Sequence, residues 1–160
     1  MHDLVDVREL LDYNKQVRHR YLAILAKLPW DELVKNREAS WHSLRNIFIH
    51  TMGATDHWLA FLQGQEHGKQ RGFDDYKTIS EIEEYTEQVE ERMQKYVDSL
   101  TSDKLKTRFK VTNDVGENVE VIAEDVLVHV FEEEVHHRGE MIALLWQMGI
   151  EPPLMGWKYL

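Results

Sequence analysis

Apolar residues recur every three to four positions over long stretches of the chain, the period of an amphipathic helix. This pattern predicts a first helix over residues 4–28, which ends before Pro29 because proline disfavours helical geometry in the preceding residue. A second helix is predicted from Ser40, the expected N-cap, to residue 63, with Gly64 as its stop. The polar stretch 31–39 between them is expected to be a connector.

The second half of the chain follows the same logic with one exception. A polar loop over 64–77 precedes a third helix, which starts near Thr78, or near Ser80 with Glu83 completing a capping box, and ends near residue 100. Apolar and polar residues then alternate over 108–122, which predicts a short β-hairpin with its turn at 113–116. A fourth helix is predicted over 123–148, and the tail 154–160, with Trp157, is expected to pack on the body.

Four long helices and one hairpin predict an all-α fold, a four-helix bundle with the hairpin before the last helix. The length of 160 residues suits one domain over residues 1–160. The chain carries 19 basic and 29 acidic residues, a formal net charge of −10, which disfavours nucleic-acid binding. It has no cysteine, which excludes disulfides and thiolate ligands, and it shows neither a membrane span nor a signal-peptide pattern. We therefore expect a cytoplasmic protein.

The candidate chemistry lies on the predicted fourth helix, where polar groups interrupt an apolar face. Five apolar residues define that face: Val126, Val130, Met141, Leu144 and Met148. His129, Glu133 and His137, spaced four apart, fall on the same side, followed by Glu140. Buried polar groups need partners or a ligand, because burying each of them unpaired costs several kcal/mol.

The predicted second helix offers a further ligand, since His50 occupies a position of its apolar face and His57 lies beside that face. His50, Glu133 and His137 would give two imidazoles and one carboxylate, a set that suits Fe(II), Ni(II), Zn(II) or Mn(II). This hypothesis requires the two imidazoles to lie within about 6 Å of each other. The alternative for His50 alone is a hydrogen-bonded core histidine. A ferritin-like di-iron site is disfavoured, because it needs a second Glu-x-x-His motif.

These residues also carry a family resemblance. The segments 10–14, 28–29, 43–50 and 129–140 resemble the DinB/YfiT-like family of metal-binding four-helix bundles, of the small Bacillus type, and 149–153 resembles its closing segment. The most specific element is His137-Arg138-Gly139. The resemblance implies a divalent metal held by three histidines, which correspond here to His50, position 133 and His137. Position 133 is Glu, and Glu140 stands where glutamine is usual.

The resemblance implies thiol transfer, in which a metal ion (Ni, Zn or Fe) activates a bacillithiol-like low-molecular-weight thiol. We therefore predict a metal-dependent thiol S-transferase or hydrolase that acts on a small electrophile. Its metal ligands are His50, Glu133 and His137, with His129 as the substitute if Glu133 fails. His129 or His57 is the candidate catalytic residue that orients a ligand or moves a proton. The alternative is a non-catalytic metal-binding or stress-linked bundle.

The predicted fourth helix has a second apolar line opposite the first, formed by Val128, Phe131, Val135, Ile142 and Trp146. Either the bundle wraps this helix completely or a partner subunit covers the line. We predict a homodimer, which the resemblance also favours. Gly139 is unfavourable inside a helix, and close approach of a neighbouring helix would explain it.

Overall fold

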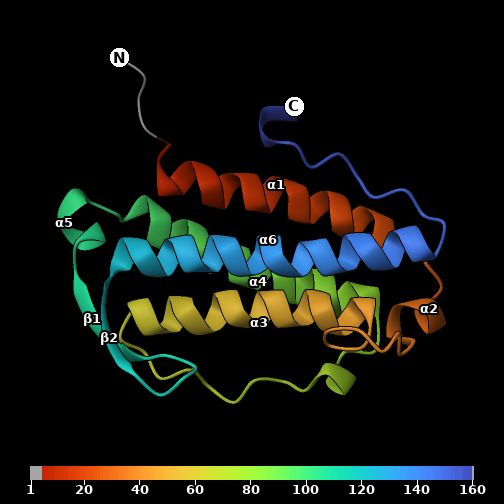
Figure 1. The fold of residues 1–160 in the computed structure, drawn as a ribbon, viewed down its shortest axis with the longest axis horizontal. Coiled ribbons are helices and arrows are strands. Elements are labelled where there is room, and N and C mark those ends of the chain that lie inside the picture. The colour runs from red at the N-terminus through yellow and green to blue at the C-terminus, as the bar shows by residue number, and fades with distance from the viewer. Residues whose placement is uncertain (1–4, 160) are drawn as a thin grey trace.

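A computed structural model describes residues 5–159 and confirms a helical bundle with a hairpin before the last helix (Figure 1). Within these residues four long helices form the body. They are α1 (Val7–Leu25), α3 (Leu44–Leu62), α4 (Ile79–Asp98) and α6 (Ala123–Gln147). The hairpin pairs β1 (Arg108–Thr112) with β2 (Asn118–Ile122) in antiparallel register. Short helices α2 (Trp30–Val34) and α5 (Ser102–Leu105) lie in connections.

The four long helices pack in the cyclic order α1, α6, α3 and α4. Figure 1 shows α1 and α6 running in one direction and α3 and α4 in the other. Helix α3 has 19 residues and is therefore about 28 Å long at 1.5 Å per residue. Because the consecutive helices α3 and α4 are parallel, the chain must cross back over this length between them. This crossover is the predicted polar loop 64–77, and it includes a short 3₁₀ segment, η1 (Phe73–Asp75).

The bundle core consists of two apolar clusters at opposite ends, with buried polar residues between them. One cluster centres on Tyr21, Phe48 and Leu145, and the other on Leu11 and Leu127. The intervening layer contains buried polar and charged side chains from all four long helices: Asn14, Arg18, Thr51, Thr55, Asp56, Thr86, Glu90, Glu134, His137 and Arg138. Such a layer needs internal partners, because buried unpaired polar groups are costly.

Three local expectations are wrong in detail. Helix α3 begins after Ser43, whose side chain accepts from the Asn46 N–H, whereas the expected cap Ser40 has a left-handed backbone with φ 51°. Helix α4 is capped by Thr78, the first of its two expected starts, but its capping box uses Glu81 rather than Glu83. The expected connector 31–39 overlaps the short helix α2.

The described part of the tail packs on α1, as expected. The rings of Tyr13 and Trp157 lie 5.3 Å apart, and the Arg20 guanidinium donates to the Leu154 carbonyl over 2.6 Å. Helix α1, Val7–Leu25, is shorter at both ends than the expected helix 4–28. Position 4 of that range and tail residue 160 lie outside the described residues.

Among the helices described, none combines the length and the apolar character that crossing a bilayer requires.

Gly139 departs from expectation. It is exposed on α6, and a Cβ added to it would meet no heavy atom within 4 Å outside its own helix. The close neighbour expected from the sequence is therefore absent from the described part of the chain.

Candidate metal centre

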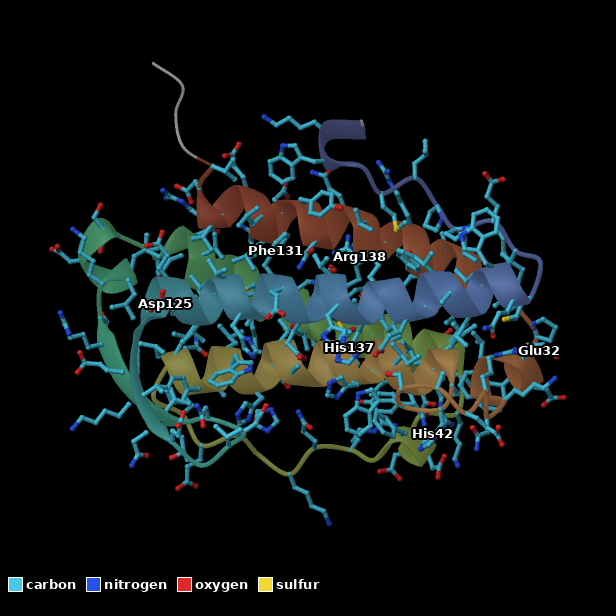
Figure 2. The ribbon with its side chains drawn as sticks, in the orientation of Figure 1. Glu32, His42, Asp125, Phe131, His137 and Arg138 are labelled. Carbon is cyan, nitrogen blue, oxygen red and sulfur yellow. The ribbon has the colours of Figure 1, made fainter. Side chains whose placement is uncertain are left out.

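Helices α3 and α6 bring the three expected ligands together. His50 lies near the middle of α3, and Glu133 and His137 lie one turn apart on the side of α6 that faces α3. Figure 2 shows His137 on this side of α6 and Arg138 toward α1. Arg138 donates to the Asn14 side chain on α1. The adjacent residues His137 and Arg138 of α6 therefore face different helices, α3 and α1.

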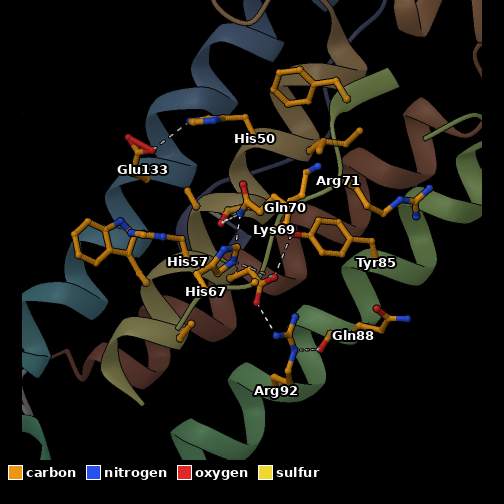
Figure 3. A pocket seen from close by; sticks show the side chains of 18 of the residues that line it. His50, His57, His67, Lys69, Gln70, Arg71, Tyr85, Gln88, Arg92 and Glu133 are labelled. Atoms are coloured by element: carbon orange, nitrogen blue, oxygen red, sulfur yellow. Dashed lines mark hydrogen bonds and ion pairs between the residues drawn. The ribbon is translucent and has the colours of Figure 1, made fainter. Parts of the chain in front are cut away.

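The three side chains form a compact cluster. Glu133 Oε2 lies 3.7 Å from His50 Nε2 and 3.5 Å from His137 Nε2, as Figure 3 shows for the first pair. The two imidazole centroids are 4.6 Å apart with their planes at 84°, which meets the 6 Å requirement. One ligand atom from each residue lies within 4.8 Å of both others.

This donor set fits a divalent metal ion. Ligand atoms at about 2.0–2.2 Å from one ion are separated by about 3.0–3.5 Å from each other. The observed carboxylate–imidazole distances of 3.5 and 3.7 Å need little convergence to reach that range. Two imidazoles and one carboxylate on one side of an ion leave its other positions open. His129, the substitute ligand, lies outside this cluster.

The Nδ1 atom of His137 is engaged on the opposite side of its ring. It lies 2.7 Å from Oε2 of Glu140, which also accepts a hydrogen bond from the Ser40 hydroxyl. Burial opposes ionisation of Glu140, but the hydrogen bonds from His137 and Ser40 prevail and lower its pKa. An ionised carboxylate only accepts, so the Nδ1–H of His137 donates to Glu140, and Nε2 is the ring atom left to face the cluster.

His50 is also held from outside the cluster. The indole of Trp41 stacks on its ring at 4.3 Å between centroids and 27° between planes. Burial, followed by the charge of His137, lowers the pKa of His50, although the Glu133 and Glu140 carboxylates oppose the shift. A neutral imidazole is the form that binds metal, so this environment favours ligation at neutral pH.

The cluster lies at one side of a large open cleft of about 1320 Å³ (Figure 3). The crossover 64–77 forms part of its wall, and the Gln70 side chain donates to the Gly53 carbonyl of α3 over 3.0 Å. A Cβ on Gly53 would lie 3.1 Å from this amide, so glycine lets the crossover approach α3. The cleft is therefore built from residues far apart in sequence.

Both candidate catalytic histidines line this cleft without joining the cluster. His57 is exposed, and its ring lies 5.5 Å from that of His67. His129 packs edge-on against Trp58 at 5.3 Å, with Nδ1 3.4 Å from Glu132. Their placement suits contact with a bound substrate rather than coordination of the same ion.

A second group of possible ligands, His136, His137 and Glu140, shares His137 with the cluster. Its geometry would use the His137 Nδ1 atom that already contacts Glu140. His136 is exposed, as the sequence indicated.

Sequence reasoning missed the outer contacts of the centre. Ser40 reaches Glu140 across 100 positions, and Trp41 reaches His50 from an irregular segment. It also missed Asp56, a charged residue on the buried face of α3, which lies 2.7 Å from Arg92 and 3.4 Å from the Tyr85 hydroxyl. The signal that identified His50, a polar residue on an apolar face, could have found Asp56 as well.

The chain is similar to known proteins over nearly its whole length. The model of the DinB family matches residues 1–158. The uncharacterized protein YizA of Bacillus subtilis (strain 168) is 20% identical over 148 residues, which cover 90% of this chain and 89% of that protein. The crystal structure of a DinB-like protein from Bacillus cereus ATCC 10987 has a TM-score of 0.69 at 17% identity, with 92% of this chain and 93% of that chain covered. The structural likeness supports the fold.

Proposed function

The chain belongs to the DinB family, and from this premise we propose that it is a divalent-metal-dependent enzyme with ligands His50, Glu133 and His137. Its reaction is the attack of a small nucleophile, a low-molecular-weight thiol or water, on a small electrophile. The metal is Ni, Zn or Fe, in keeping with the two imidazoles and one carboxylate of the set.

One observation carries the proposal: three donors from two helices converge at the side of an open cleft. Three protein ligands leave coordination positions that a substrate can reach, as in catalytic rather than structural metal sites. When bound, the ion would favour the ionised form of a thiol or a water molecule at neutral pH.

Three further side chains have separate roles in this proposal. Glu140 holds the proton of His137 on Nδ1 and so keeps Nε2 available as a ligand atom. His57 and His129 line the cleft beside the centre and can orient a substrate or accept its proton. The cleft has ample room for a small-molecule substrate.

Elemental analysis tests the metal site directly. Protein purified without a histidine tag is expected to retain one divalent ion per chain, and His137→Ala and His50→Ala to lose it. His136→Ala is the matched control, because His136 adjoins His137 but lies outside the cluster. A wild-type protein that binds no divalent ion, even when supplied with Ni²⁺, Zn²⁺ and Fe²⁺, would exclude this function.

Catalysis needs a separate assay on the metal-loaded protein. Monochlorobimane with a panel of low-molecular-weight thiols reports transfer as fluorescence, and ester or amide substrates report hydrolysis. We expect one of these activities, and we expect His50→Ala to abolish it. Stoichiometric metal without either activity would instead favour the non-catalytic metal-binding alternative.

A further inference from the structure

Segment 36–43, which connects α2 to α3 beside the metal centre, has an unusual backbone. In the described chain, positive φ values at residues other than glycine occur at Glu38, Ser40, His42 and Lys158. The three in this segment are 55°, 51° and 76°. Such conformations are uncommon for residues with a Cβ and persist only where the surroundings hold them.

Hydrogen bonds close the segment on itself and tie it to α2. The Arg37 N–H donates to the His42 carbonyl over 2.6 Å, and the His42 N–H donates to the Ala39 carbonyl over 2.8 Å. The Arg37 guanidinium donates to the backbone and carboxylate of Glu32 over 3.1 and 2.6 Å. The strained loop is therefore fixed at its base.

Two neighbouring residues of this loop act on different metal ligands, Trp41 by direct contact with His50 and Ser40 through Glu140. Ser40 donates to the carboxylate of Glu140, which holds His137 on α6. Trp41 stacks on the ring of His50 on α3 and also packs edge-on against Phe73 at 5.9 Å. One short segment thus contacts the ligand systems of both helices.

We propose that segment 36–43 is a clamp that sets the geometry of the metal centre from outside, with Ser40 and Trp41 as positioning residues. The inference rests on the proposed function, since it concerns the orientation of metal ligands. Outer contacts fix the tautomer and ring orientation of a ligating histidine, and their loss typically weakens metal affinity about 10- to 100-fold. The strained backbone is explained by the need to present two neighbouring side chains to two helices.

Cobalt(II) is a suitable probe, because its visible absorption reports coordination geometry and its affinity can be measured against a chromophoric chelator. We expect Ser40→Ala and Trp41→Ala each to weaken Co²⁺ binding about tenfold and to shift its absorption bands. Trp41→Phe keeps a stacking ring and Glu140→Gln keeps an acceptor for His137, so both should retain most of the affinity.

Matched controls separate positioning from general destabilisation. Ser99→Ala and Trp146→Ala remove an exposed serine hydroxyl and an exposed indole that contact no residue of the cluster. Both should bind Co²⁺ as the wild type does, and circular dichroism should show native helicity in every variant.

The outcomes distinguish this inference from the function on which it rests. If wild-type protein binds no Co²⁺, both fail. If the wild type binds Co²⁺ and S40A and W41A match it in affinity and spectrum, the clamp alone is overturned. Loss of Co²⁺ in His136→Ala would also overturn it, because Glu140 would then be a ligand of the second group rather than a support for His137.

Discussion

Glu133 brings a carboxylate where the resemblance drawn from the sequence implies a third imidazole. Its Oε2 atom lies between the Nε2 atoms of His50 and His137, at 3.7 and 3.5 Å. A carboxylate offsets one charge of a divalent cation and is a harder ligand than imidazole. The substitution should therefore preserve metal binding while changing which ions are preferred.

Exchange of this one side chain tests that reasoning. We expect Glu133→His to weaken Fe²⁺ binding relative to Ni²⁺ and Zn²⁺, changing the ratio of dissociation constants about tenfold or more. Chelator competition with each ion measures the ratio. Glu132→His is the control, because Glu132 is the adjacent exposed carboxylate on α6 and lies outside the cluster. An unchanged ratio in E133H would show that Glu133 is not a ligand.

Helix α1 is tied to two other helices by a buried ion-pair network opposite the metal centre. Arg18 lies 2.7 Å from Glu90 of α4 and 2.6 Å from Glu134 of α6, and its Nε donates to the second oxygen of Glu134. All three side chains are buried. Glu133 and Glu134 are consecutive, so one turn of α6 serves the metal centre on one side and this network on the other.

Loss of Arg18 should destabilise the bundle strongly. Arg18→Ala leaves the buried Glu134 without its cation and Glu90 with only the His19 imidazole, and breaking a buried pair in this way costs roughly 3–5 kcal/mol in the free energy of unfolding. Arg18→Lys keeps the charge but loses the bidentate contact, so we expect an intermediate loss. Urea denaturation followed by circular dichroism measures both.

The control for this prediction is Arg8→Ala on the same helix. Arg8 pairs with Asp6 at the surface, where solvent screens the interaction, so its removal should change the free energy of unfolding little. Equal losses in R18A and R8A would contradict a structural role for the buried network.

Periodicity predicts elements well when a long apolar face has to be buried, and all four long helices and the hairpin are confirmed. It predicts the start of α3 and the capping box of α4 less well, because several serines and threonines near the start of each helix can cap it. Ser40 is not a helix cap, because Glu38, Ser40 and His42 have left-handed backbone conformations. The sequence does not predict these conformations, since none of the three residues is glycine. The cluster of His50, Glu133 and His137 was predictable from polar residues on apolar faces, whereas the Ser40 and Trp41 contacts depend on that irregular backbone.

On the scale of the whole molecule, the outer face of α6 is not covered by the rest of the described chain. Val128, Val135 and Trp146 are 42%, 41% and 59% exposed. At about 100° per residue they lie within about 20° of one line along the helix. Phe131 and Ile142, from the same predicted line, are partly buried within the chain.

This face is the surface through which we predict homodimer formation. Gly139 lies on the same side with open space around its Cα, so the α6 helices of two copies could approach closely there. An apolar stripe used by both copies forms an isologous contact, the commonest arrangement in soluble homo-oligomers. We expect the wild type to sediment as a dimer at micromolar concentration, and Val135→Glu to sediment at the monomer mass of 19.0 kDa.

A charge placed elsewhere on the surface should not have this effect. Val115→Glu alters the most exposed valine, at the hairpin turn and away from α6, and should leave the dimer intact. Metal content should stay equal in both variants, because neither residue belongs to the ligand cluster. If the wild type itself sediments only as a 19.0 kDa species, the apolar line on α6 serves another purpose and the dimer prediction is wrong.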